Sequence, residues 1–108
     1  MTADALLVFV TFPDEASARS TVGVLVGERL AACGTILAGA ESIYRWQGAI
    51  ESSAEHLVLL KTATKCYPRL ESRLTELHPY DVPECVAVPV SQGLPAYLNW
   101  IAESTGDR

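Results

Sequence analysis

The sequence is short of positive charge. Its 108 residues include 8 Lys and Arg against 13 Asp and Glu, which gives a formal net charge of −5. Proteins that bind nucleic acids or anionic membranes do so with clustered basic side chains, and no such cluster occurs in this sequence. We therefore expect neither nucleic acid nor a membrane surface as a partner.

Long apolar runs and paired cysteines are also missing. The longest uninterrupted apolar run covers residues 5–10, whereas a membrane helix needs roughly 17 or more. Cys33, Cys66 and Cys85 form no Cys-x-x-Cys pair, and their odd number argues against a disulfide framework. No basic segment precedes the first apolar run, so we expect no secretory signal and a cytoplasmic location.

What the sequence does contain is one domain, residues 1–108, in which strand and helix patterns alternate. Pro13 ends the first strand, Asp14 can cap the first helix, and Gly34 is well placed as its left-handed stop. The expected elements, in order, are a strand at 5–12, a helix from Asp14 to Cys33, a hairpin preceded by a strand start at 35–40, a helix at 65–77, a strand at 84–90, a helix at 95–103 and a frayed tail at 104–108.

The hairpin at residues 41–62 is unusually long. Gln47-Gly48 forms its turn, because glycine supplies the positive φ that a two-residue loop requires. Each arm could be nearly double the usual strand length of about 5 or 6 residues. Arms of this length extend past a core of this size, so we interpret the hairpin as an assembly element.

The order strand-helix-strand-strand-helix-strand predicts an α+β fold. Its usual closed form is a four-stranded antiparallel sheet with both helices on one face. The first strand is apolar on both faces and should be central, as should the third. Pro89 lacks a donor for the sheet and indicates that the fourth strand lies at an edge. The other sheet face carries apolar side chains without helices, and we expect a partner to cover it.

Six motifs, in this order and spacing, resemble the CutA family, also called divalent-cation-tolerance proteins. Together they cover nearly the whole chain. They are VTFPDE at 10–15, ERLAAC at 28–33, ESIYRWQGAIE at 41–51, LLKT at 59–62, ELHPYDVPE at 76–84 and YLNWI at 97–101.

This resemblance implies a ferredoxin-like subunit in a tight homotrimer, with sheets facing inward and hairpins completing neighbouring sheets. It also implies a role in tolerance to divalent ions, copper in particular, without an agreed enzymatic reaction. In bacterial members copper binding is attributed to Cys, His and Glu. Here Val10 and Leu77 occupy the first two positions, Glu84 matches the third, and His78 is the nearest substitute for the histidine. The expected metal ligands, for weakly held Cu²⁺ or another divalent cation, are therefore His78 and Glu84.

Each candidate residue also has a structural interpretation. His78, at a helix C-terminus, can bond the last carbonyl groups, which we favour over ligation. Lys61 can pair with a carboxylate or extend to water. For the aromatic side chains, subunit packing is favoured over ligand stacking. The residues expected to line clefts between subunits are Cys33, Tyr44, Trp46, Lys61, Tyr80 and Trp100, together with His78 and Glu84.

Three other functions use the same topology. A small-ligand or nucleotide sensor resembling the PII signalling proteins is the main alternative, although no glycine-rich or basic phosphate cradle is visible. An acylphosphatase needs an arginine beside an anion loop, and the corresponding residues 12–15 are acidic. An RNA-binding domain needs a basic sheet surface. We therefore expect a non-enzymatic binding or signalling protein.

Overall fold

The computed structural model describes residues 4–107. The start of the chain at residues 1–3, on which the expected absence of a signal depends, lies outside this range. The elements are β1 (Ala5–Phe12), α1 (Glu15–Gly27), β2 (Cys33–Trp46), β3 (Ala49–Ala63), a 3-10 turn η1 (Thr64–Cys66), α2 (Tyr67–Leu77), β4 (Val86–Pro89) and α3 (Pro95–Ser104).

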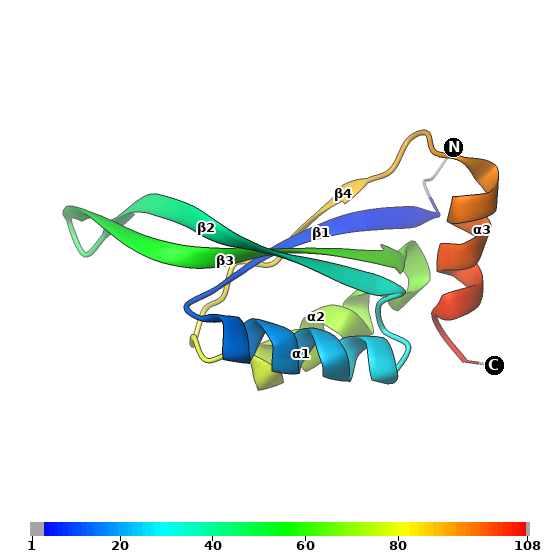
Figure 1. The fold of residues 1–108 in the computed structure, drawn as a ribbon, viewed down its shortest axis with the longest axis horizontal. Coiled ribbons are helices and arrows are strands. Elements are labelled where there is room, and N and C mark those ends of the chain that lie inside the picture. The colour runs from blue at the N-terminus through cyan, green and yellow to red at the C-terminus, as the bar shows by residue number, and fades with distance from the viewer. Residues whose placement is uncertain (1–3, 108) are drawn as a thin grey trace.

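The sheet has the predicted order. Its strands run β2-β3-β1-β4, and each neighbouring pair is antiparallel, so β1 and β3 are central. Pro89 lies in the edge strand β4, paired with Leu6. Figure 1 shows α1 and α2 side by side on one face of the sheet and α3 across the end opposite the hairpin tip.

The core lies between the sheet and these two helices. From β1, Val8, Val10 and Phe12 are at most 1% exposed, and Leu70 and Leu74 of α2 are fully buried against the same cluster. Burying one such side chain contributes roughly 1.5 to 3 kcal/mol. The alternation along β1 therefore fixes which sheet face carries the helices.

The first helix ends earlier than the sequence predicted. Asp14 caps it as expected, accepting from the Ser17 N–H at 2.8 Å. The helix ends at Gly27, and the residue with positive φ that follows it is Arg29, at 62°. Gly34, predicted to be the helix stop, instead lies in β2 opposite Leu60. Its missing side chain lets α1 approach the sheet closely, because a Cβ there would lie 2.6 Å from Val22 Cγ1.

The hairpin prediction is confirmed. Its arms, β2 and β3, are 14 and 15 residues long, and Figure 1 shows them extending well beyond the helices. Gln47 and Gly48 have φ values of 50° and 83°, as a tight turn requires. The predicted irregularity at Gly39 is a bulge between Leu37 and Ala40, where Gly39 has a φ of 85°.

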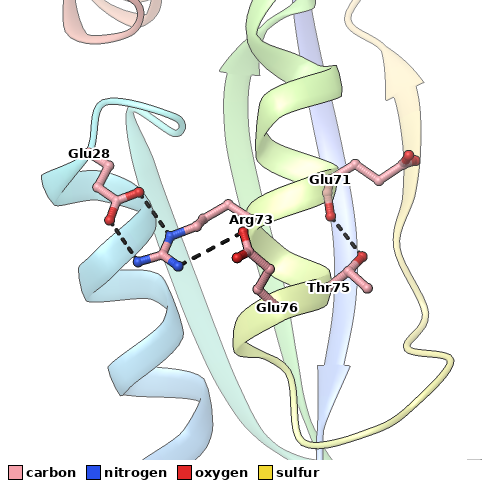
Figure 2. Close-up of polar contacts among 5 residues, drawn as sticks. All are labelled: Glu28, Glu71, Arg73, Thr75 and Glu76. Atoms are coloured by element: carbon pink, nitrogen blue, oxygen red, sulfur yellow. Dashed lines mark hydrogen bonds and ion pairs between the residues drawn. The ribbon is translucent and has the colours of Figure 1, made fainter.

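A surface ion pair ties the two covering helices together. Arg73 of α2 donates from both Nε and Nη2 to the Glu28 carboxylate just after α1, at 3.0 and 2.9 Å, and approaches Glu76 at 4.0 Å (Figure 2). Within α2, the Thr75 hydroxyl donates to the Glu71 carbonyl at 2.8 Å. A bidentate Arg–carboxylate pair fixes geometry better than a single contact does, so it holds the helices in register on the sheet.

The end of the chain is more ordered than predicted. Ser104 completes α3, and Thr105 and Gly106 are buried. The Arg29 guanidinium donates to the carbonyls of Gly106 and Glu103 at 2.7 and 2.6 Å, and the Gly106 N–H donates to the Arg29 carbonyl at 2.9 Å. The prediction of a frayed tail was wrong for these residues, because contacts from a distant loop hold them.

Candidate functional site

The sheet face turned away from α1 and α2 is apolar and open, as predicted. Leu7, Phe9 and Leu59 of the central strands are only half-buried there. Val86 and Val88 of β4 continue the same face and are 53% and 44% exposed. Exposed apolar side chains in one continuous row indicate a surface that contacts another molecule.

A groove of about 850 Å³ opens between the half of the hairpin nearest its turn and the loop that follows α2. The hairpin contributes side chains that alternate onto one face of each arm, and the loop closes the opposite wall. Its lining residues are Thr11, Ser42, Tyr44, Trp46, Glu51, Glu55, Pro79, Tyr80, Asp81, Val82, Pro83 and Glu84.

His78 does not line the groove, but it holds in place the loop that forms one of the groove's walls. Its Nε2–H donates to the Thr11 carbonyl at 2.7 Å, and its Nδ1 accepts from the Tyr80 N–H at 3.0 Å. We assign this tautomer because a carbonyl oxygen can only accept. The ring also stacks on Phe12, with centroids 4.4 Å apart. Burial lowers the pKa of His78, although the Thr11 carbonyl and Glu55 partly oppose that shift. The neutral imidazole therefore anchors the loop to β1.

Tyr80 links the loop that follows α2 to Glu55, the most buried acidic residue of the groove. Its hydroxyl donates to Glu55 Oε2 at 3.2 Å, and Glu55 is only 7% exposed. Burial, and then the negative charge of Glu55, raise the pKa of Tyr80, so this phenol stays protonated and continues to donate. Tyr80 is thus fixed at both its backbone and its side chain.

The groove is strongly acidic. Glu51, Glu55, Asp81 and Glu84 line it, whereas none of the described lining residues is Lys, Arg or His. Opposite charge is attracted to such a cleft and like charge is repelled from it. Its chemistry therefore favours cations and disfavours phosphate groups.

Of the two predicted metal ligands, only Glu84 lines the groove. Glu84 is exposed in the groove lining, but His78 lies behind the wall with both ring nitrogens bonded within the chain. Within residues 4–107, no group of three or more His, Cys, Asp and Glu could hold a metal ion. A metal bound by His78 would have to displace Thr11 or Tyr80, so ligation by this pair stays a prediction.

The six predicted cleft residues fall into two groups. Tyr44, Trp46 and Tyr80 line the groove. The other three, Cys33, Lys61 and Trp100, lie at the opposite end of the sheet. There Cys33 pairs with Lys61 across the strands, and its Sγ is 3.7 Å from the Tyr97 hydroxyl of α3.

The reasoning from sequence missed three of the four groove carboxylates. Glu51, Glu55 and Asp81 were not singled out. Glu55 did carry a signal, because it shares a strand face with Leu57 and Leu59 and so falls on the open face of the sheet. A carboxylate in that row is unusual enough to mark a site.

Within the described range, no helix combines the length and the apolar character needed to cross a membrane. The cytoplasmic location nevertheless stays a prediction, because one relative, from rice (Oryza sativa subsp. japonica), is named "Protein CutA 1, chloroplastic". That relative is 36% identical over 104 residues, which are 96% of this chain and 59% of the rice protein.

Comparison with known proteins gives matches over nearly the whole chain. The divalent-cation tolerance protein CutA of Thermus thermophilus is 49% identical over 100 residues, 93% of this chain and 97% of that protein. The crystal structure of CutA from Xylella fastidiosa is 50% identical, with a TM-score of 0.94 over 96% of this chain and 100% of that one. The family described as CutA1 divalent ion tolerance protein matches residues 6–104. The resemblance to the CutA family is thereby confirmed, and the chain belongs to the CutA1 divalent ion tolerance protein family.

Proposed function

We propose that the protein is a homotrimer that takes part in tolerance to divalent metal ions, copper among them, by non-enzymatic binding or signalling at clefts between its subunits. The observation that carries this proposal is the open sheet face. Val86 and Val88 continue a row of half-buried side chains from the central strands. An apolar row of this kind is stable in water when a second chain covers it.

The hairpin supplies the covering surface. Its outer part is exposed on both faces, with Ile43 at 70% on one side and Trp46 at 57% on the other. An arm on one subunit that packs against a sheet face on the next is a head-to-tail contact, and such contacts form a closed ring when the rotation between neighbours divides a full turn. Three members is the number that the family resemblance implies.

Weak metal binding follows from the acidity of the groove. Carboxylates attract divalent cations, and Glu84 is exposed there. Copper is also bound well by imidazole, which makes His78 the second ligand once one of its nitrogens is released. Because that release breaks a bond to the Thr11 carbonyl or the Tyr80 N–H, we expect weak affinity.

A binding role is favoured over catalysis by the state of His78. A general base needs a nitrogen that can reach substrate, whereas both nitrogens of this ring are bonded to the backbone. The alternative of a PII-like nucleotide sensor is disfavoured by the groove, whose carboxylates repel phosphate.

The metal part of the proposal is tested by calorimetry. Titrating Cu²⁺ into the metal-free protein should show weak binding that is lost in a His78→Ala, Glu84→Ala double variant. A Glu76→Ala variant removes a carboxylate from the far helix surface and is expected to keep it. Unchanged copper stoichiometry in the double variant would exclude both residues as ligands.

A further inference from the structure

The segment that follows α3 is held by one residue from a distant loop. The Arg29 guanidinium donates to the Gly106 and Glu103 carbonyls at 2.7 and 2.6 Å, and the Gly106 N–H donates to the Arg29 carbonyl at 2.9 Å. Hydrogen bonds from a guanidinium are strong because the donor is charged. These three bonds, which we call the Arg29 latch, join the end of α3 to the loop that follows α1.

The backbone at the latch does not favour an arginine. Arg29 has a φ of 62°, in the left-handed region that glycine adopts freely and other residues adopt rarely. The latch, by contrast, requires a guanidinium. Arginine therefore favours the latch at the expense of the local backbone, and substitution of this one residue can separate the two contributions.

The latch closes residues 105–107 over a buried thiol. Cys66, which precedes α2, is fully buried, and Thr105 is 3% exposed. A Cβ at Gly106 would lie 3.7 Å from the Cys66 Sγ, so the glycine backbone lies directly against this sulfur. Displacing residues 105–107 would uncover the thiol on that side.

Little besides the latch holds residues 105–107 in place through polar contacts. Within residues 4–107, their other polar contacts are bonds from the Thr105 hydroxyl to carbonyls of α3 and a long contact between Asp107 and Arg69. The first do not reach beyond α3, and the second joins exposed groups, which contributes little. A segment held by few contacts opens locally at a lower free energy than the whole fold unfolds.

We propose that residues 105–107 form a strap that opens as a local unit while the rest of the fold stays intact, and that the strap controls access to Cys66. The closed strap shields the thiol, and the open strap lets it react with thiol-directed electrophiles. An adduct on the sulfur occupies the space of the Gly106 backbone, so modification holds the strap open. The device is thus a two-state switch. It does not rest on the proposed metal role.

The test is the rate at which iodoacetamide alkylates Cys66 in the full chain, with peptide mass spectrometry separating this thiol from Cys33 and Cys85. The Cys66 thiolate displaces iodide to form a C–S bond, and the thiol proton passes to solvent. The rate follows the population of the open strap when closing is faster than alkylation. Because local opening exposes little surface, we expect a wild-type rate that is nearly independent of urea below the unfolding transition.

Arg29→Lys keeps the charge but not the forked donors, and it should speed alkylation of Cys66 about fivefold or more. Arg29→Gly removes the latch and suits the left-handed backbone, so it should speed the reaction about tenfold or more with a smaller effect on the urea midpoint. Arg19→Lys is the matched control, because the exposed Arg19 bonds only Glu15 within residues 4–107, and it should leave the rate unchanged.

A second measurement checks the switch itself. After alkylation of Cys66, the amide of Gly106 should exchange with solvent at least tenfold faster, while the amide of Val10 in β1 keeps its protection. Three results would overturn the proposal: a Cys66 rate in Arg29→Lys equal to wild type, a wild-type rate that rises with urea as steeply as global unfolding, or unchanged protection of Gly106 after alkylation. The urea dependence keeps the test decisive if either Arg29 variant misfolds.

Discussion

Replacing Gly34 by alanine should destabilise the fold, although the change adds one methyl group. The new Cβ would lie 2.6 Å from Val22 Cγ1 and 2.9 Å from Leu60 Cδ2, closer than carbon atoms pack. Neither neighbour can move away easily, because Leu60 is 1% exposed and Val22 is branched at Cβ and 9% exposed. Overpacking of this kind costs about 1 to 3 kcal/mol.

The assay is urea unfolding followed by circular dichroism, at one fixed protein concentration since assembly would contribute to stability. Gly23→Ala in α1 is the matched control, because a Cβ at Gly23 meets no atom within 4 Å. The same chemical change there should stabilise the protein by roughly 0.5 to 1 kcal/mol through helix propensity. If Gly34→Ala were as stable as wild type, the close approach of α1 to β2 would be refuted.

Two further predictions concern buried hydrogen bonds. Burial lowers the pKa of His78 below its ordinary value of 6.5, so the unfolded chain binds a proton that the folded chain does not. The stability that His78 contributes is thus present above pH 6.5 and is lost as the pH falls below it. In urea unfolding with EDTA present, the free energy of unfolding should therefore fall more steeply with decreasing pH in wild type than in His78→Gln. Equal slopes in the two proteins would contradict this. The fully buried Thr62 hydroxyl donates to the Leu30 carbonyl at 2.6 Å. Thr62→Val keeps the shape of the side chain but leaves that carbonyl unpaired, so it should lower the free energy of unfolding by about 1 to 3 kcal/mol. An unchanged urea midpoint would show that the bond contributes nothing.

Much of the fold could be predicted because local chemistry and topology agree. The apolar β1 and the proline in β4 independently placed these strands at the centre and edge of the sheet. The glycine of Gln47-Gly48 was sufficient to predict where the hairpin turns. Such features depend on neighbours in the sequence, which is why the sequence reveals them.

The predictions of the fold were wrong where the conformation is determined by contacts between residues that are distant in the sequence. Gly34 looked like a helix stop, but its missing side chain serves packing against Val22. The left-handed residue is instead Arg29, whose guanidinium bonds carbonyls at the far end of the chain. Neither contact leaves a local pattern, so the helix end and the ordered tail could not be predicted.

The residues predicted to line clefts between subunits lie in two groups within one chain, and their role in such clefts stays a prediction. Tyr44, Trp46 and Tyr80 do share one groove, but Cys33 begins the strand that Trp46 ends. At 3.3 Å per residue these ends lie about 40 Å apart, so one single-chain cleft cannot hold both groups. Alternation along β3 places Glu55 on the open face, but its contact with Tyr80 depends on a loop that is distant in the sequence.

The central claim is that the open sheet face is a subunit interface, and light scattering of the purified protein at about 10 μM tests it most directly. We predict a mass three times that of the 11.6 kDa chain. Val88→Asp on the open face should lower that mass while circular dichroism still shows a folded chain, whereas Val26→Asp, on an exposed site of α1, should leave it unchanged. A wild-type mass equal to one chain would contradict the account.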